Sequence, residues 1–213
     1  AINALDIHDI DENSLVKTLA HMQSAISLYK ESGNENSPEL VHFRNILGTI
    51  LYRSARFVDA LSEFRQALAL AEKNGRQFTE EAAGALSGMA WSYKELGQYD
   101  EAISAANRAK EVRQSLFGSL SSEVAKSNIQ IADLELALGH RQEAIALATA
   151  ALQSGRSRGS AESQIMMSLD VICRAQSPID GKTFCERAVR MAEQKYGRVS
   201  LQAGYVINDY ASN

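Results

Sequence analysis

The sequence predicts an all-α fold built from a repeated helical hairpin, and three observations support this. A first set of alanines keeps a 42-residue interval: Ala25, Ala67, Ala109 and Ala151. A second set keeps the same interval seven positions upstream: Ala60, Ala102 and Ala144. The 213-residue chain has only two prolines and 7% aromatic residues, which favours helix throughout. A fixed period of this length is typical of a repeat array, in which stacked copies of one unit share a continuous core.

Apolar residues recur at helical spacing along the chain, and the ends of the segments carry helix signals. Asn13 or Ser14 can cap the first helix, and Gly33 can end it. Pro38 lies in the first turn of the second helix, where its missing N–H costs nothing. The expected helices cover, approximately, residues 14–31, 38–55, 58–73, 80–96, 99–116, 121–138, 141–154, 161–175, 181–195 and 199 onward.

Short turns separate these helices. Gly97 and Gly139 stand one such interval apart, where two antiparallel helices of a hairpin meet. Ala55 occupies the same place in the preceding unit, so that turn must form without glycine. No charge run or proline-rich linker divides the chain, and we expect a single domain. Its expected units are 1–37 (partial), 38–78, 79–119, 120–158, 159–197 and 198–213 (partial).

A further set of small residues keeps the 42-residue interval on the first helix of each unit: Gly48, Ala90 and Ala132. Large residues stand directly beside them: Leu47, Met89 and Ile131. Small sites that face large ones are what interdigitating helix faces require. Phe64 is replaced by Ala106 and Ala148 in the later units, so the core there should be thinner or differently packed.

These positions resemble the tetratricopeptide repeat. The resemblance rests on two stretches: Leu47-Gly48-x-x-Leu51 with Ala60-x-x-x-Phe64-x-x-Ala67, and Met89-Ala90-x-x-Tyr93-x-x-x-Gly97-x-Tyr99-x-Glu101-Ala102-Ile103. The usual unit has about 34 residues, and the longer interval here is similar to the extended variety of kinesin light chains and bacterial signalling proteins. The resemblance implies a right-handed superhelical solenoid of about ten helices in antiparallel hairpins. It also implies a concave wall, formed by the first helix of each unit, that binds peptides.

The last part of the chain departs from the interval. Only 37 residues separate Ala151 from Ala188, the next expected small site, and the following site at Ala211 lies two residues before the end. Repeat arrays normally end in a capping element, so we expect a fragment of a longer array. The first unit is also partial, because residues 1–11 make a poor first helix.

Composition excludes several classes of function. The net charge of −4 disfavours a nucleic-acid partner, and the chain has no apolar run long enough to span a membrane. No signal peptide is visible at the N-terminus. Cys173 and Cys185 are the only cysteines, and we expect buried free thiols in a reducing compartment, hence a cytoplasmic protein.

The sequence offers no catalytic constellation. Its four histidines are widely separated: His8, His21, His42 and His140. Cys173 and Cys185 lie in the two helices of one hairpin and could approach each other, but two thiols alone make no zinc site. Neither a nucleophile elbow nor a phosphate-binding glycine loop is present. The segment 155–159 carries two arginines that could hold an anion, but it also has the composition of a plain flexible turn. We therefore expect no enzyme activity, no cofactor and no metal.

Helical phase selects the residues that face the expected groove. The candidate peptide-binding residues are Asn45, Thr49, Tyr52, Arg53, Trp91, Lys94, Lys126 and Asp133. Trp91 is the only tryptophan and could anchor a ligand side chain, although it could equally pack against a neighbouring helix. Asparagines on this face clamp peptide backbones in relatives, which the resemblance implies for Asn45. Thr49 and Asp133 interrupt the pattern of chaperone-docking relatives, so chaperone docking is not expected.

Two functions remain. The first is a scaffold that binds a protein or peptide in the groove, as part of a larger signalling or regulatory protein. The alternative is a structural spacer that self-associates through exposed repeat ends. In that case a homodimer would form through the truncated last helix, with its apolar residues Val206, Ile207 and Tyr210.

Overall fold

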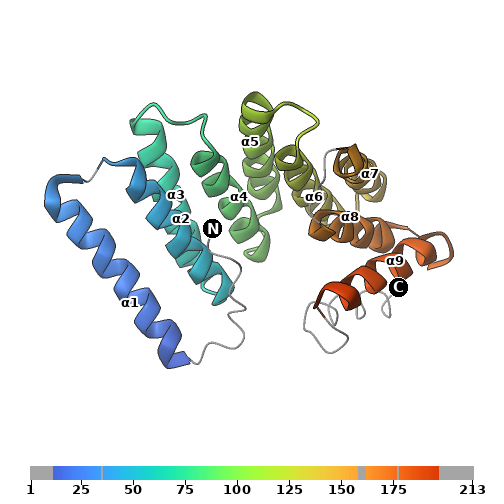
Figure 1. The fold of residues 1–213 in the computed structure, drawn as a ribbon, viewed down its shortest axis with the longest axis horizontal. Coiled ribbons are helices and arrows are strands. Elements are labelled where there is room, and N and C mark those ends of the chain that lie inside the picture. The colour runs from blue at the N-terminus through green and yellow to red at the C-terminus, as the bar shows by residue number, and fades with distance from the viewer. Residues whose placement is uncertain (1–11, 35, 158–161, 177, 197–213) are drawn as a thin grey trace. The chain divides into compact units, whose positions relative to one another are not determined.

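The computed structural model describes residues 12–34, 36–157, 162–176 and 178–196. Along the chain these residues form α1 (Glu12–Tyr29), the π-helical turn η2 (Lys30–Asn34), α2 (Pro38–Arg53), α3 (Phe57–Lys73), α4 (Glu80–Glu95), α5 (Tyr99–Phe117), α6 (Ser122–Ala137), α7 (Arg141–Ser157), α8 (Glu162–Ala175) and α9 (Pro178–Tyr196) (Figure 1). The described residues include no strand. The expected all-α repeat fold is therefore confirmed.

The chain forms two compact units, Ala1–Val112 and Arg113–Asn213, and each is described by itself. The division falls inside α5, so no linker marks it, and the expectation of a single domain stays a prediction. The expected helices agree with the observed ones to within a few residues. One detail is wrong: Asn13 and Ser14 lie inside α1 rather than before it. The helix expected from residue 199 onward lies outside the described residues.

Three helices have an N-cap residue with a side-chain hydroxyl, and these residues keep the 42-residue interval. The side chains of Ser37, Thr79 and Ser121 accept hydrogen bonds from backbone N–H groups three residues later, at 3.3, 3.3 and 3.2 Å. Each satisfies one of the N–H groups that the first turn of a helix leaves without a partner. The start of α2, α4 and α6 is thus fixed locally, in the same way each time.

The hairpin turn without glycine is confirmed. Ala55 has a φ of 56°, while Gly97 and Gly139, at the equivalent turns, have φ of 74° and 84°. The left-handed region is easy for glycine and strained for a residue with a Cβ. The α2–α3 turn therefore keeps the geometry of its counterparts at some cost in conformational energy.

In the first unit, α3 packs against both α2 and α4 through the Phe64 ring. The ring is only 3% exposed. A Cβ added at Gly48 on α2 would lie 2.8 Å from the ring, and one at Gly88 on α4 would lie 2.4 Å from it. Both helices can approach Phe64 because both positions lack a side chain.

In the second unit the small residue lies on the second helix of the hairpin and the larger one on the helix that follows, the reverse of Phe64 and Gly88. Ala148 on α7 replaces Phe64, and the buried core around it includes Ala132 on α6 and Val171 on α8. Where the second helix of the hairpin has lost its large side chain, the next helix supplies a larger one in place of Gly88. The expectation of a differently packed core is confirmed, and the interior stays filled as close packing requires.

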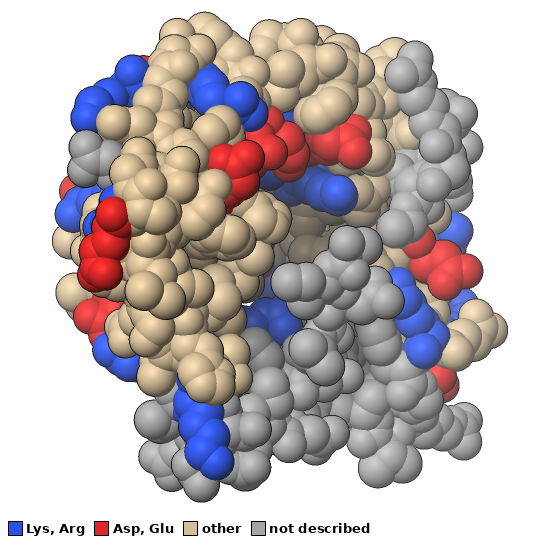
Figure 2. All heavy atoms as spheres, turned by 60° about the vertical axis from the view of Figure 1, so that its left-hand side comes forward, with Lys and Arg blue, Asp and Glu red and all other residues tan. Residues whose placement is uncertain are grey.

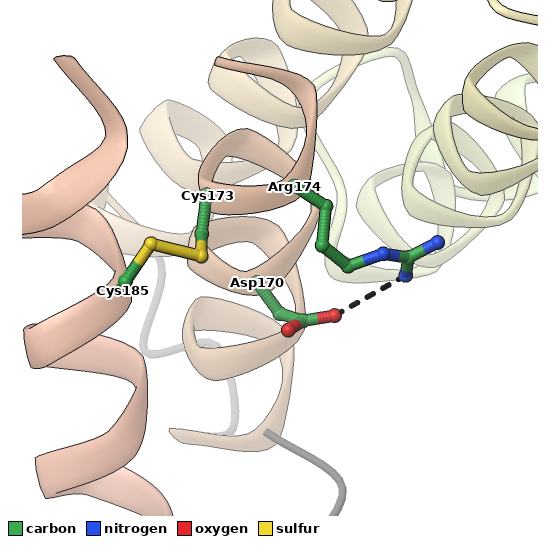
Figure 3. The surroundings of a disulfide bond; sticks show 4 residues. All are labelled: Asp170, Cys173, Arg174 and Cys185. Carbon is green, nitrogen blue, oxygen red and sulfur yellow. Dashed lines mark hydrogen bonds and ion pairs between the residues drawn. A yellow bond between two sulfur atoms is a disulfide. The ribbon is translucent and has the colours of Figure 1, made fainter. Parts of the chain in front are cut away.

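A disulfide joins Cys173 on α8 to Cys185 on α9, with the Cα atoms 4.9 Å apart (Figure 3). The expectation of free thiols is therefore wrong, although both residues are buried as expected, each 3% exposed. Disulfides persist mainly in oxidising compartments, so the argument from cysteine usage no longer supports a cytoplasmic location.

The position of the disulfide follows from the repeat. In each hairpin, two small residues 12 positions apart occupy the place where its helices approach closely: Gly48 with Ala60, Ala90 with Ala102, and Ala132 with Ala144. The cysteines have the same sequence separation of 12. The cysteines therefore occupy the two small sites of the last hairpin. Each follows its counterpart in the preceding hairpin, Ala132 or Ala144, by one residue less than the regular interval. In that register the site equivalent to Ala151 is Ala192, which is 0% exposed. Ala188 is also 0% exposed, so burial does not distinguish the two sites, and the choice of Ala188 stays a prediction.

Candidate functional site

Helices α2 and α4 lie side by side in the first unit and present one continuous surface. We call this surface the α2–α4 face, and six of the predicted binding residues lie on its two helices: Asn45, Thr49, Tyr52, Arg53, Trp91 and Lys94. The other two, Lys126 and Asp133, lie on α6 in the second unit.

Asn45 joins the two helices of the face. Its side chain is half-buried, and Nδ2 donates a 2.8 Å hydrogen bond to the backbone carbonyl of Glu81 on α4. The other amide atom, Oδ1, is buried and has no hydrogen-bond partner among the described residues. Such an unsatisfied acceptor is destabilising by about 1–3 kcal/mol. The hydrogen bond from Nδ2 nevertheless links α2 to α4, a role that helical phase alone did not predict for Asn45.

The C-terminal ends of α2 and α4 are also linked. The Tyr52 hydroxyl donates to Glu95 Oε1 at 3.1 Å, and the Tyr52 ring lies 5.5 Å from the ring of Phe57. Arg53 follows directly and is exposed, as is Thr49 one turn earlier, whose hydroxyl bonds back to the carbonyl of Asn45. An aromatic ring and a cation thus stand together at this end of the face.

Trp91 lies on α4 beside this end. Its side chain is half-buried, and Lys94 Nζ lies 5.3 Å from the centre of the indole ring. A cation at this distance over tryptophan is attracted by the ring's negative face. Lys94 belongs to the same helix as Trp91, so this contact does not decide between the two alternatives that the sequence left open, and an anchoring role for Trp91 stays a prediction.

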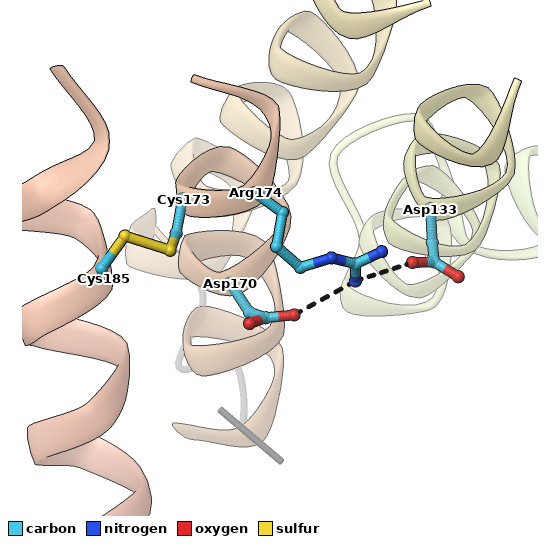
Figure 4. A network of polar contacts seen from close by, with 5 residues as sticks. All are labelled: Asp133, Asp170, Cys173, Arg174 and Cys185. Atoms are coloured by element: carbon cyan, nitrogen blue, oxygen red, sulfur yellow. Dashed lines mark hydrogen bonds and ion pairs between the residues drawn. A yellow bond between two sulfur atoms is a disulfide. The ribbon is translucent and has the colours of Figure 1, made fainter. Parts of the chain in front are cut away.

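On α6, Lys126 is exposed, whereas Asp133 is only 8% exposed. Arg174 Nη1 on α8 lies 2.9 Å from Asp133 Oδ1 and 3.4 Å from Asp170 Oδ2 (Figure 4). A carboxylate this buried needs a paired charge. Asp133 thus links α6 to α8. The sequence analysis did not select Arg174 or Asp170, although Asp133 and Arg174 stand at equivalent repeat positions with opposite charges. A ligand-binding role for Lys126 and Asp133 stays a prediction.

Two glutamates beside helix N-termini have lowered pKa values. The backbone N–H of Glu39 and the Ser37 hydroxyl hydrogen-bond its carboxylate and lower its pKa below the usual 4.5. Burial acts to raise the pKa of Glu123, but its own backbone N–H, the Ser122 hydroxyl and the nearby cations Lys126 and Arg113 outweigh this and lower it. Both carboxylates stabilise the helix start in their ionised form.

The face of the molecule shown in Figure 2 carries charges of both signs in its described part. Acidic and basic side chains alternate with uncharged surface on the face in view in Figure 2. Within the described residues, no group of three or more histidine, cysteine, aspartate or glutamate side chains could hold a metal ion. Nor does any helix of that part of the chain have the length and apolar character needed to cross a membrane.

The hairpin array and its small-residue sites define a class of protein. Residues 81–157 match the tetratricopeptide repeat family, a stretch that runs from α4 to α7 and covers less than half of the chain. The resemblance seen in the sequence is therefore confirmed, and the described chain has a tetratricopeptide repeat fold. Proteins with these repeats are generally interaction scaffolds rather than enzymes.

Among solved structures, the chain is similar to a Podosopora anserina protein described as a kinesin light chain with nearly identical TPR-like repeats. The identity is 14%, the TM-score is 0.64, and the similarity covers 94% of this chain and 90% of that one. BtubC (BKLC) from P. vanneervenii gives 15% identity and a TM-score of 0.62, over 95% and 85% of the two chains. MamA gives 16% and 0.51, over 92% and 88%. No curated protein matches the sequence. At these identities the similarity shows the fold alone.

Proposed function

We propose that this chain is a protein-interaction scaffold that binds an extended segment of a partner protein on the α2–α4 face, as part of a larger signalling or regulatory protein. The observation that carries the proposal is Trp91, a half-buried indole under Lys94, next to the linked ends of α2 and α4. A rigid aromatic ring beside cations is the kind of anchor that contributes most to binding energy at protein interfaces.

The face is already organised to bind. Asn45 fixes the spacing of α2 and α4, and the Tyr52–Glu95 hydrogen bond fixes their C-terminal ends. A ligand therefore meets a surface that need not be ordered on binding, which preserves more of the interaction energy as affinity. No catalytic step or cofactor is part of the proposal.

A pull-down from a lysate of the source cell tests this function. The wild-type chain is compared with a Trp91→Ala, Arg53→Ala variant and with a control, Glu72→Ala, Arg108→Ala, which removes an exposed ion pair between α3 and α5. We expect a partner that both the wild type and the control retain and that the Trp91 variant loses. Cross-linking should then place that partner beside α2 and α4. A partner that all three proteins retain would move the function away from this face.

Self-association through repeat ends is a second candidate, because the outer side of α1 is uncovered. Ala25 is exposed, although its counterparts Ala67 and Ala151 are at most 2% exposed, and Leu28 is 66% exposed. The patch at residues 206–210, which the sequence suggested for a dimer, lies outside the described residues. Light scattering over a range of concentrations, for wild type and Leu28→Glu, tests the idea. A monomer throughout would exclude it.

A further inference from the structure

We propose that a basic cavity between α2 and α3 binds a phosphorylated side chain of a partner protein. The cavity lies in the first unit, has a volume of about 360 Å³ and is lined by residues of η2, α2 and α3. Its lining includes none of the predicted binding residues of the α2–α4 face. The inference therefore goes beyond the proposed function and does not depend on it.

Three cations line this cavity: Lys30, Arg44 and Lys73. No aspartate or glutamate of the described residues belongs to the lining. Both lysines are exposed, and neither has an ion-pair partner in the part of the chain that the structure describes. The carboxylate of Glu39, in the first turn of α2, lies outside the lining and has Arg76 nearby to offset its charge. The two lysine charges are thus available to a ligand in the cavity.

Arg44 is the buried cation of the cavity, with only 6% of its surface exposed. Its Nη1 donates a hydrogen bond to Glu63 Oε2 on α3. A guanidinium has five N–H donors, and the others have no hydrogen-bond partner among the described residues. Burying a charge with unused donors is unfavourable, so an anion in the cavity would be stabilised by them. The three cations exceed the single carboxylate of Glu63 by two charges.

The next repeat lacks this set of charges. One interval of 42 residues further along, an acidic, an apolar and a polar residue replace the three cations: Glu72, Leu86 and Ser115. Ala105 replaces Glu63 in the same way, so the buried ion pair is not part of the repeat framework. A second cavity is lined by Leu86 and Ala105, and it carries the carboxylates of Asp100 and Glu101 instead. The basic character therefore belongs to the first cavity and is not required by the fold.

The charge of the cavity fits a phosphate monoester. A phosphorylated side chain carries a charge of about −1.5 to −2 at pH 7 and has three acceptor oxygens. These match the excess of two positive charges and the three cations, whereas a carboxylate supplies half of that charge. The unused guanidinium donors of Arg44 suit phosphate oxygens, which arginine binds through parallel hydrogen bonds.

The remaining lining favours a phosphate that is attached to a side chain over a free phosphate ion. Leu40 and Leu70 give the cavity an apolar wall. The carbon atoms of a phosphorylated residue can bury apolar surface against this wall, which contributes to binding. Inorganic phosphate has no such atoms. We therefore expect the cavity to distinguish the two sources of the same anion.

Isothermal titration calorimetry of the full chain tests the ligand class with four probes: the capped amino acids phosphotyrosine, phosphoserine and glutamate, and inorganic phosphate. At least one of the two phosphorylated residues should bind five times more tightly than inorganic phosphate and ten times more tightly than glutamate. Equal affinity for inorganic phosphate would overturn the side-chain source. Equal affinity for glutamate, or binding of neither phosphorylated residue, would overturn the phosphate site.

Two variants place the binding in the cavity. Lys30→Ser, Lys73→Ser removes both exposed cations, and its matched control, Lys17→Ser, Lys110→Ser, makes the same change of charge on α1 and α5. The second variant, Arg44→Leu, Glu63→Ala, copies the pair that the next repeat already accommodates, so the chain should still fold. Both variants should bind the phosphorylated residue at least tenfold more weakly, and the control should bind like wild type. Equal affinity in all four proteins would overturn the proposal.

Nuclear magnetic resonance of the wild-type chain locates the probe directly. Backbone amide shifts on adding the phosphorylated residue should cluster at residues 36–44 and 66–74, which surround the cavity. The Trp91→Ala, Arg53→Ala variant should bind this probe like wild type, because neither residue lines the cavity. Shifts confined to the α2–α4 face, or binding that is lost with Trp91 and Arg53, would overturn the assignment to this cavity.

Discussion

Replacing Gly88 by alanine tests the packing of the first unit most directly. The new methyl group would lie 2.4 Å from two atoms of the Phe64 ring. Non-bonded carbon atoms prefer about 3.5–4.0 Å, so the ring or α4 must move by roughly 1 Å or more. Gly48 encloses the same end of the ring, where a Cβ would lie 2.8 Å away. A displaced ring must therefore push other buried atoms.

The size of the effect is the balance of two terms. Overpacking of this kind destabilises by about 1–3 kcal/mol. Alanine favours helix over glycine by about 1 kcal/mol. We expect Gly88→Ala to lower the free energy of unfolding by up to about 2 kcal/mol, even though the substitution improves helix propensity.

Gly84, one turn earlier on α4, provides a matched control. A methyl group there meets only Asn45 Nδ2, at an ordinary contact distance of 3.8 Å. Gly84→Ala should therefore stabilise the chain by up to about 1 kcal/mol, through helix propensity alone. The same substitution in the same helix has opposite signs at the two positions only if Phe64 fills the space beside Gly88.

Urea unfolding followed by far-ultraviolet circular dichroism measures both variants, and hydrogen exchange of α3 and α4 locates the change. Units of a repeat array can unfold separately, so the exchange data show whether the loss is in the first unit. Phe64→Leu should be less destabilising in the Gly88→Ala background than in wild type. Equal stability of the Gly84 and Gly88 variants, or no coupling to Phe64, would refute the reasoning.

Three further predictions follow from single features. Ala55 and Gly97 both have positive φ, which glycine adopts without strain. Ala55→Gly should therefore raise the thermal midpoint of unfolding slightly, by the equivalent of up to about 1 kcal/mol, and Gly97→Ala should lower it. A lower midpoint for Ala55→Gly would contradict this. Replacing both Cys173 and Cys185 by alanine should destabilise the α8–α9 hairpin by about 3 kcal/mol, from the loop entropy of a short cross-link. A reductant should then lower the melting temperature of wild type and leave that of the variant unchanged. Folding lowers the pKa of Glu123 from its ordinary value of 4.5, so the ionised carboxylate stabilises the folded chain. This contribution to the free energy of unfolding is complete above the unfolded pKa and is lost as the pH falls through the lower pKa of the folded chain. Glu123→Gln should thus be destabilising at pH 7, by less than about 1 kcal/mol for a group that is only partly buried, and neutral once the pH lies below the folded pKa. An equal loss at both pH values would exclude this origin.

Two features of the last hairpin had a signal in the sequence that the count of alanines obscured. The separation of 12 between the small sites of each hairpin applies to Cys173 and Cys185 as well. If the last repeat is aligned on the cysteines rather than on Ala188, its interval is only one residue shorter than the regular one. This alignment places the two sulfur atoms where the helices of the hairpin meet. The pairing of Asp133 with Arg174 follows from the same register.

The sequence by itself determined the helices, their turns and the repeat, because these depend on local physics. Apolar spacing, hydroxyl caps and positive φ at a hairpin turn act over a few residues, and the period repeats them. Only the tertiary structure decided the contacts of individual side chains. Asn45 has the helical phase of a groove residue but bonds to the backbone of α4, and Phe64 needs two glycines from different helices. Helical phase gives the direction of a side chain from its own helix axis. The neighbouring helix, and the distance at which it packs, decides what that side chain contacts.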